Sequence, residues 1–105
     1  MISRFEKYKG IHPGIVIARE LDKRAIKQRP FALSIGEHPQ TFNAITKGKR
    51  NINAAIALKI EKALDLEEGT LLILQVFYDI KLAKQKWEPT RPDLSKLRKS
   101  LFWDT

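Results

Sequence analysis

The 105-residue sequence has room for one domain of roughly 70 to 90 ordered residues and a tail, which excludes a large multi-domain enzyme. Its 43% hydrophobic and 30% charged residues are typical of a globular protein, and no apolar run approaches the ~20 residues needed to span a bilayer, so we expect a cytoplasmic protein without a membrane partner. The net charge of +8 favours a polyanionic partner, with nucleic acid as the leading candidate, while the lack of cysteine excludes disulfides and thiolate metal sites.

The first predicted helix follows a chain breaker, His-Pro-Gly, at residues 12–14. After it, Ile17, Leu21 and Ala25 recur at four-residue spacing with charges between them, which predicts an amphipathic helix. A second, short helix is predicted from about Gln28 to Ile35. Its apolar face consists of Phe31, Ala32 and Ile35.

Glycine and asparagine delimit the next two predicted helices. A tight turn at residues 36–38, where glycine supplies a positive φ, leads into a third helix from Pro39 to about Lys47, with Phe42 and Ile45 pointing inward. Gly48 closes that helix. Asn53 caps a fourth helix that runs to about Leu66. The expected buried stripe of the fourth helix is Ile56, Ala57, Ile60 and Leu64.

The fifth predicted helix, from about Glu68 to Lys86, carries more apolar side chains than one core face buries. They are Leu71, Leu72, Ile73, Leu74, Val76, Phe77, Ile80 and Leu82. Either a second copy of the chain or the basic, aromatic C-terminal tail must cover them. No segment shows the period-two alternation of a strand, so the fold class is all-α: an extension at residues 1–10, a five-helix bundle at 11–86 and a tail at 87–105.

Residues 28–50 have the layout of a helix-turn-helix, with a short helix, a glycine turn and a second helix that leaves a polar face exposed. Short polar groups and a methyl on that face suit base edges in a major groove: Gln40, Thr41, Asn43 and Ala44. An amide and three cations on either side suit phosphates: Gln28, Lys47, Lys49 and Arg50. The alternative is that two packed helices joined by a glycine turn produce the same apolar pattern and the polar face only meets solvent.

The two imidazoles have simpler expected roles. His12 is expected to cap or pack near the start of the first helix, while His38, in the glycine turn, either contacts a phosphate or caps the third helix. Glu61 and Lys62 are interpreted as surface charge. Because no Ser/His/Asp set, phosphate-binding glycine loop or paired carboxylates can be assembled, we expect no enzymatic activity, no metal and no cofactor.

With these residues in view, the sequence resembles the HigA-type antitoxins, or plasmid-maintenance antidote proteins, of the XRE/Cro-like helix-turn-helix group. The resemblance covers about residues 11–83. The family's His-Pro-Gly, Gln-x-x-apolar-Ala, Gln-Thr-apolar-x-x-Ile, Gly-x-Arg, Ala-Leu-x-Leu-x-x-Ala-Leu and Leu-Gln-x-x-Tyr-Asp motifs fall on residues 12–14, 28–32, 40–45, 48–50, 57–64 and 74–79. The chain departs from the family pattern at Pro30, at His38-Pro39 and at Thr70-Leu71.

The resemblance implies a lambda-repressor-like bundle that binds a palindromic operator in double-stranded DNA as a homodimer and represses its own toxin-antitoxin operon. It also implies a cognate toxin as protein partner. The excess apolar surface of the fifth helix makes that helix the expected dimer interface. A second hypothesis is a protein-interaction module, in which the bundle and the aromatic tail bind a toxin or another partner and DNA contact is incidental.

Overall fold

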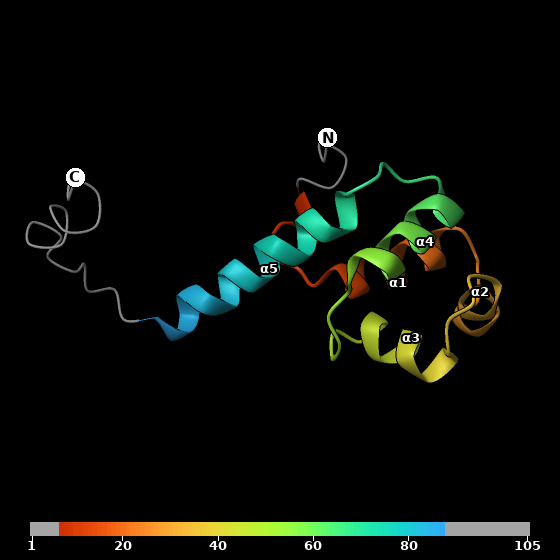
Figure 1. Ribbon diagram of the computed structural model, residues 1–105, viewed down its shortest axis with the longest axis horizontal. Coiled ribbons are helices and arrows are strands. Elements are labelled where there is room, and N and C mark those ends of the chain that lie inside the picture. The colour runs from red at the N-terminus through yellow and green to blue at the C-terminus, as the bar shows by residue number, and fades with distance from the viewer. Residues whose placement is uncertain (1–6, 88–105) are drawn as a thin grey trace, which may run out of the picture.

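The computed structural model describes residues 7–87 of the chain, which form five helices and no strand. The helices are α1 (Pro13–Lys23), α2 (Gln28–Ser34), α3 (Pro39–Thr46), α4 (Ala54–Leu64) and α5 (Thr70–Lys86). Figure 1 shows α1 to α4 gathered at one end of the molecule, while α5 leads away from them. The all-α prediction is confirmed. None of these helices is long and apolar enough to cross a membrane.

Side chains just before three helices cap their first turns. The Nδ1 atoms of His12 and His38 accept from the amides of Gly14 (2.9 Å) and Gln40 (3.2 Å) at the starts of α1 and α3. Asn53 caps α4 in the same way. The capping roles predicted for both histidines and for Asn53 are therefore confirmed, and a phosphate contact from the exposed His38 stays a prediction.

The end of α1 differs from its sequence prediction. The helix ends at Lys23, and Ala25, predicted to join its apolar stripe, is exposed and left-handed at φ +56°. The amide of Ile26 donates to the carbonyl oxygen of Leu21 (2.9 Å), and this six-residue closure requires a left-handed residue at Ala25. Apolar spacing continued past the real helix end, so placing Ala25 in the stripe was wrong. The connection from α4 to α5 is likewise longer than predicted: α4 ends at Leu64 instead of about Leu66, and α5 begins at Thr70 instead of about Glu68.

The core contains side chains from all five helices and from the loop between α3 and α4. Its buried members are Val16, Ile17, Leu21, Phe31, Ala32, Phe42, Ile45, Ile52, Ile56, Ala57, Ile60, Leu64, Leu71 and Leu74. Every residue predicted to point inward from α2, α3 and α4 is buried except Ile35, which is half-buried. The rings of Phe31 and Phe42, 5.6 Å apart between centroids, pack α2 against α3.

Gly14 lets the start of α1 approach the end of α3 closely. A Cβ atom at this position would lie 1.7 Å from the carbonyl oxygen of Ile45 and 2.5 Å from its carbonyl carbon. Because both atoms belong to the backbone, no side-chain rotation relieves the overlap. The glycine of the His-Pro-Gly motif therefore fixes where α3 lies relative to α1.

A buried carboxylate joins α4 to α5. Glu61 is 2% exposed, and its two oxygens accept from the amides of Gly69 (3.1 Å) and Leu71 (2.9 Å) at the start of α5. Interpreting Glu61 as surface charge was therefore wrong. The sequence pattern did not show that α5 would present unpaired amides, and a positive dipole end, directly above this side chain.

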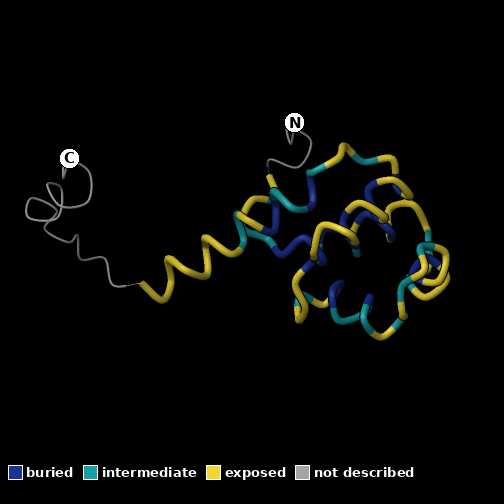
Figure 2. Tube along the Cα trace, in the orientation of Figure 1, coloured by how far each residue is buried: buried dark blue, intermediate teal, exposed yellow. Residues whose placement is uncertain are grey.

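The second half of α5 is largely exposed, as Figure 2 shows. Leu71 and Leu74 are buried, whereas Val76, Ile80 and Trp87 are 54%, 44% and 62% exposed. The prediction that this helix carries more apolar surface than the core covers is confirmed for the described chain. The alternative in which the tail covers that surface concerns residues 88–105, which lie outside the described residues.

Candidate nucleic-acid interface

The turn between α2 and α3 has the backbone geometry predicted for a helix-turn-helix. Gly36 adopts φ +74°, and the amide of Glu37 donates to the carbonyl oxygen of Ala32 (2.9 Å), which closes α2 and turns the chain into α3. Ala32 is fully buried, as expected for a small residue where the two helices cross. α3 is therefore held in a defined orientation after the turn.

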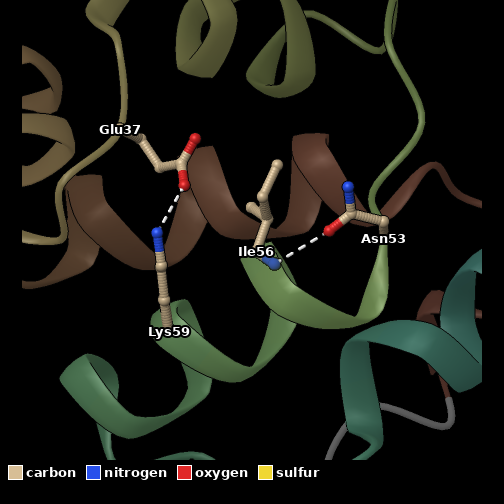
Figure 3. A network of polar contacts seen from close by, with 4 residues as sticks. All are labelled: Glu37, Asn53, Ile56 and Lys59. Carbon is tan, nitrogen blue, oxygen red and sulfur yellow. Dashed lines mark hydrogen bonds and ion pairs between the residues drawn. The ribbon is translucent and has the colours of Figure 1, made fainter.

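An ion pair ties this turn to α4. The Lys59 ammonium lies 2.8 Å from Glu37 Oε2, with the lysine side chain 46% and the glutamate side chain 16% exposed. Figure 3 shows Lys59 extending from α4 toward the turn, on the helix that Asn53 caps. The Glu37 carboxylate lies next to α3 and by itself would repel phosphates. The Lys59 ammonium beside it offsets that negative charge. Sequence reasoning missed it because the partners are 22 positions apart.

A hydrogen bond between side chains joins the start of α2 to the end of α3. The Thr46 hydroxyl lies 3.0 Å from Gln28 Oε1 and 3.0 Å from the carbonyl oxygen of Asn43. Thr46 is buried, and sequence reasoning missed it. Its position four residues after the inward-facing Phe42 was a usable signal, because a polar group on a buried helix face needs a partner.

Three of the predicted DNA-contacting residues meet in one surface depression of about 420 Å³ between α2 and α3. It is lined by Gln28, Arg29, Pro39, Gln40 and Asn43. The structure thus brings together two predicted base readers and one predicted phosphate contact. Arg29, absent from the sequence-based set, supplies a cation at the same place.

The remaining predicted base readers lie on the same helix. Thr41 and Ala44 are half-buried at the α3 surface, and Lys47, the residue after α3, is exposed. The side chains of α3 that do not enter the core are therefore short and uncharged until Lys47. A helix surface of this kind suits direct contact with base edges.

The predicted phosphate contacts Lys49 and Arg50 lie on the loop that follows α3, and both are exposed. Gly48, at φ +76°, closes the helix, and the amides of Lys49 and Arg50 both donate to the carbonyl oxygen of Ala44 (2.9 and 3.2 Å). The loop therefore starts in a fixed position relative to α3.

Gln75 of α5 anchors the far end of this loop. Its Oε1 accepts from the amide of Ile52 (2.9 Å), and its Nε2 donates to the side chains of Asn51 (3.2 Å) and Asp79 (2.9 Å). Gln75 belongs to the Leu-Gln-x-x-Tyr-Asp motif, so the structure gives that motif a role in holding the loop that displays Lys49 and Arg50.

His12 lies buried beneath the same loop, with its ring edge-on to Tyr78 at 5.0 Å between centroids. Burial lowers its pKa below the ordinary value, an effect that Asn51, the Arg50 backbone and the Asp79 carboxylate oppose. Nε2 makes no well-aligned hydrogen bond within the described residues. Across residues 7–87, no three His, Asp or Glu side chains are grouped to hold a metal ion.

Comparison with known proteins identifies the fold of the segment that carries this surface. A family model described as helix-turn-helix matches residues 17–71, more than half of the chain. The chain belongs to the helix-turn-helix family. The match includes α2, the Gly36 turn and α3.

Relatives of this helix-turn-helix protein agree with the resemblance to plasmid-maintenance antidotes. A structure from Nostoc punctiforme, described as an antidote protein of a plasmid maintenance system, is 38% identical, covers 73% of this chain and 85% of its own, and has a TM-score of 0.69. Virulence-associated protein I of Dichelobacter nodosus is 29% identical over 76 residues, which are 71% of this chain and 70% of the relative. The HigA-type resemblance is thereby confirmed at the level of family.

A second solved structure shares the fold alone. PA4674 from Pseudomonas aeruginosa, solved in complex with its operator DNA, is 22% identical and superposes with a TM-score of 0.70 over 90% of this chain and 97% of its own. This likeness concerns the fold, and the operator complex is a finding about PA4674.

Proposed function

We propose that this helix-turn-helix protein is a sequence-specific DNA-binding antitoxin that represses its own toxin-antitoxin operon. The observation that carries the proposal is the fixed, short, polar surface of α3 beside exposed cations. α3 is held by Gly14 from α1, by the Gln28–Thr46 contact from α2 and by a turn that Lys59 ties to α4. Such a helix reaches a major groove without reorganising, so less free energy is lost in ordering it on binding.

Base readout is assigned to the residues of α3. The side-chain amides of Gln40 and Asn43 each have one acceptor and one donor group, which complement the N6 donor and N7 acceptor of adenine in the major groove. Thr41 presents a hydroxyl and Ala44 a methyl, which suit a base edge and a thymine methyl group. These four residues differ in chemistry, so the protein should distinguish sequences rather than bind all DNA equally.

Phosphate contacts are assigned to the two ends of the unit. Gln28 and Arg29 border the start of α3 with His38, whereas Lys47, Lys49 and Arg50 follow its end. Cations on both sides of the reading helix would contact the backbones that border one groove. Because each neutralised phosphate releases counterions, this part of the affinity should fall steeply with salt.

The protein is proposed to bind a palindromic operator as a homodimer through α5. Exposed or half-buried apolar residues recur along α5 at alternating spacings of three and four, and Trp87, the residue directly after the helix, continues the series. They are Ile73, Val76, Ile80, Ala83 and Trp87. This spacing is typical of the apolar seam of a two-helix coiled coil. Figure 1 shows that α5 leads away from the bundle, which supports such a pairing. A two-fold axis would place two α3 helices on half-sites one turn apart, ~34 Å.

A toxin is proposed as the protein partner, because the Nostoc punctiforme relative is described as an antidote protein of a plasmid maintenance system. The protein is proposed to act without enzymatic activity, cofactor or metal. The described residues offer helices, caps and a basic surface, and DNA recognition requires nothing further.

The DNA-binding test is fluorescence anisotropy of a duplex from the gene's own upstream region against a scrambled duplex, at ~50 and ~200 mM salt. We expect a preference of ~10³ or more for the upstream duplex at the higher salt. Equal binding to both duplexes that collapses with salt would contradict specific repression. In that case the exposed surface of α5 would favour the protein-interaction alternative.

The dimer test is sedimentation equilibrium of Val76→Glu, with Leu33→Glu as its matched control. Both residues are exposed, at 54% and 57%, but only Val76 belongs to the α5 seam. A glutamate in a coiled-coil seam should convert the dimer to a monomer, and Leu33→Glu should leave it dimeric. A Val76→Glu protein that stays dimeric would place the interface elsewhere.

A further inference from the structure

A pocket of about 460 Å³ lies between residues 9–10 and the second half of α5. Two apolar side chains line it, Phe77 and Ile80, here called its floor, and three cations line it, Lys9, Lys81 and Lys84, here called its rim. No residue of α2, α3 or the loop after α3 lines it. The pocket is therefore a surface separate from the one assigned to DNA.

Contacts within the chain give the pocket its shape. Phe77, Lys81 and Lys84 follow each other at helical spacing, so they share one side of α5. The Lys9 ammonium lies 4.6 Å from the centre of the Phe77 ring, and the Lys81 ammonium donates to the carbonyl oxygen of Gly10 (3.2 Å). Two of the three cations are thus held at the rim by partners in the chain, which reduces the entropy lost when a ligand binds.

The pocket combines two chemical requirements. Three lysines line it without an acid among its described lining residues, which favours a ligand with negative charges. Phe77 and Ile80 form an apolar floor, which favours a ligand that also buries a large apolar side chain. A phosphate backbone meets only the first requirement.

We propose that this pocket docks an acidic segment of another protein that carries one large apolar side chain. The carboxylates would lie against Lys9, Lys81 and Lys84, and the apolar side chain would bury itself against Phe77 and Ile80. A second copy of this chain, with its net charge of +8, offers no charge complement to the three lysines of the pocket, whereas the proposed α5 seam is apolar and needs none. Ile80 belongs to both the pocket and the α5 seam, and Phe77 and Lys84 each follow a seam residue directly. The oligomeric state of Lys84→Glu therefore has to be measured beside peptide binding.

The test uses the full chain and a fluorescein-labelled peptide in which one tryptophan is flanked by glutamates. We expect saturable binding that weakens about tenfold or more when the tryptophan is replaced by alanine. Lys84→Glu should weaken binding to a similar extent because it reverses a charge at the rim. Lys62→Glu is the matched control, since Lys62 is an exposed lysine on α4 outside the pocket, and binding should change little.

Several results would overturn the proposal. Absence of peptide binding, equal binding of the tryptophan and alanine peptides, or equal loss in Lys84→Glu and Lys62→Glu would reduce the site to unspecific charge attraction. Displacement of the peptide by a scrambled DNA duplex, with the same dependence on Lys84, would make the site a nucleic-acid surface. Dissociation of the dimer in Lys84→Glu would make it an interface between copies.

Operator binding measured on the same preparations separates this proposal from the DNA-binding one. Lys84→Glu is expected to keep its preference for the upstream duplex, which also reports that the variant is folded. Failure of the peptide with operator binding intact counts against the pocket alone.

Discussion

Gly14→Ala tests whether the close approach of α1 to α3 fixes the reading helix. Helix propensity alone predicts stabilisation of about 0.5–1 kcal/mol, because alanine loses less backbone freedom than glycine on folding. The structure predicts the opposite sign. The new Cβ would lie 1.7 Å from the Ile45 carbonyl oxygen, and reaching the 3.0 Å below which Cβ atoms are essentially never found needs a backbone shift of about 1.3 Å.

Such a shift places the expected loss near the upper end of the 1–3 kcal/mol typical of overpacking, or about 2 kcal/mol after the propensity gain. In urea unfolding followed by circular dichroism, the midpoint should fall by about 1 M or more if the slope is near 2 kcal/mol/M. Operator affinity of the folded variant should fall as well, because α3 moves relative to the rest of the bundle.

Ala55→Gly is the matched control. Ala55 is the second residue of α4, as Gly14 is of α1, and it is exposed, so this change measures the propensity difference without any clash. We expect a loss of about 0.5–1 kcal/mol. A Gly14→Ala protein with a midpoint equal to or above that of the wild type would refute the steric reasoning.

Three further predictions concern other parts of the molecule. Glu61→Gln should lower the free energy of unfolding in urea by about 1–3 kcal/mol, because one amide at the start of α5 loses its acceptor. Glu67→Gln is the control at an exposed position and should lower it little. Equal losses in the two variants would contradict the buried contact. Burial lowers the pKa of His12 in the folded state, so the free energy of unfolding should be highest above pH 6.5 and decline as pH falls toward the folded pKa. His12→Asn should abolish that part of the decline. If the dependence of the unfolding free energy on pH stayed unchanged in the variant, the decline would belong to other groups. Asn43→Ala should cost ~1 to 3 kcal/mol of binding free energy on the upstream duplex and relax sequence specificity. Lys49→Ala should weaken binding to all sequences and reduce the slope of log affinity against log salt by about 1. If both variants changed affinity, specificity and salt dependence in the same way, the assigned roles would be contradicted.

Much of the fold follows from local sequence features. Glycines at positions 36 and 48, Asn53 as a cap and apolar spacings of three or four residues locate α2, α3 and α4 and their buried faces, because turn geometry and amphipathic periodicity act over a few residues. The apolar spacing failed to predict the end of α1. There Ala25 adopts the left-handed conformation, which residues other than glycine rarely adopt, so no local signal in the sequence marked that ending.

The candidate site was only partly predictable. The exposed face of α3 and the lysines after it follow from helical geometry, so the sequence identified Gln40, Asn43 and Lys49 as surface groups near one another. It did not show that Thr46 contacts Gln28 or that Lys59 pairs with Glu37, because those contacts depend on how separate helices pack.

The amino-acid sequence by itself determined the five helices of residues 7–87, the inward residues of α2 to α4, the helix-turn-helix unit and the excess apolar surface of α5. Each of these depends on the periodicity, caps and glycines of a single segment. Tertiary structure decided that Gly14 touches the backbone of Ile45, that Glu61 is buried beneath α5 and that Gln75 anchors the loop after α3. These features join residues 8 to 31 positions apart, and only the packed fold brings such residues within contact distance.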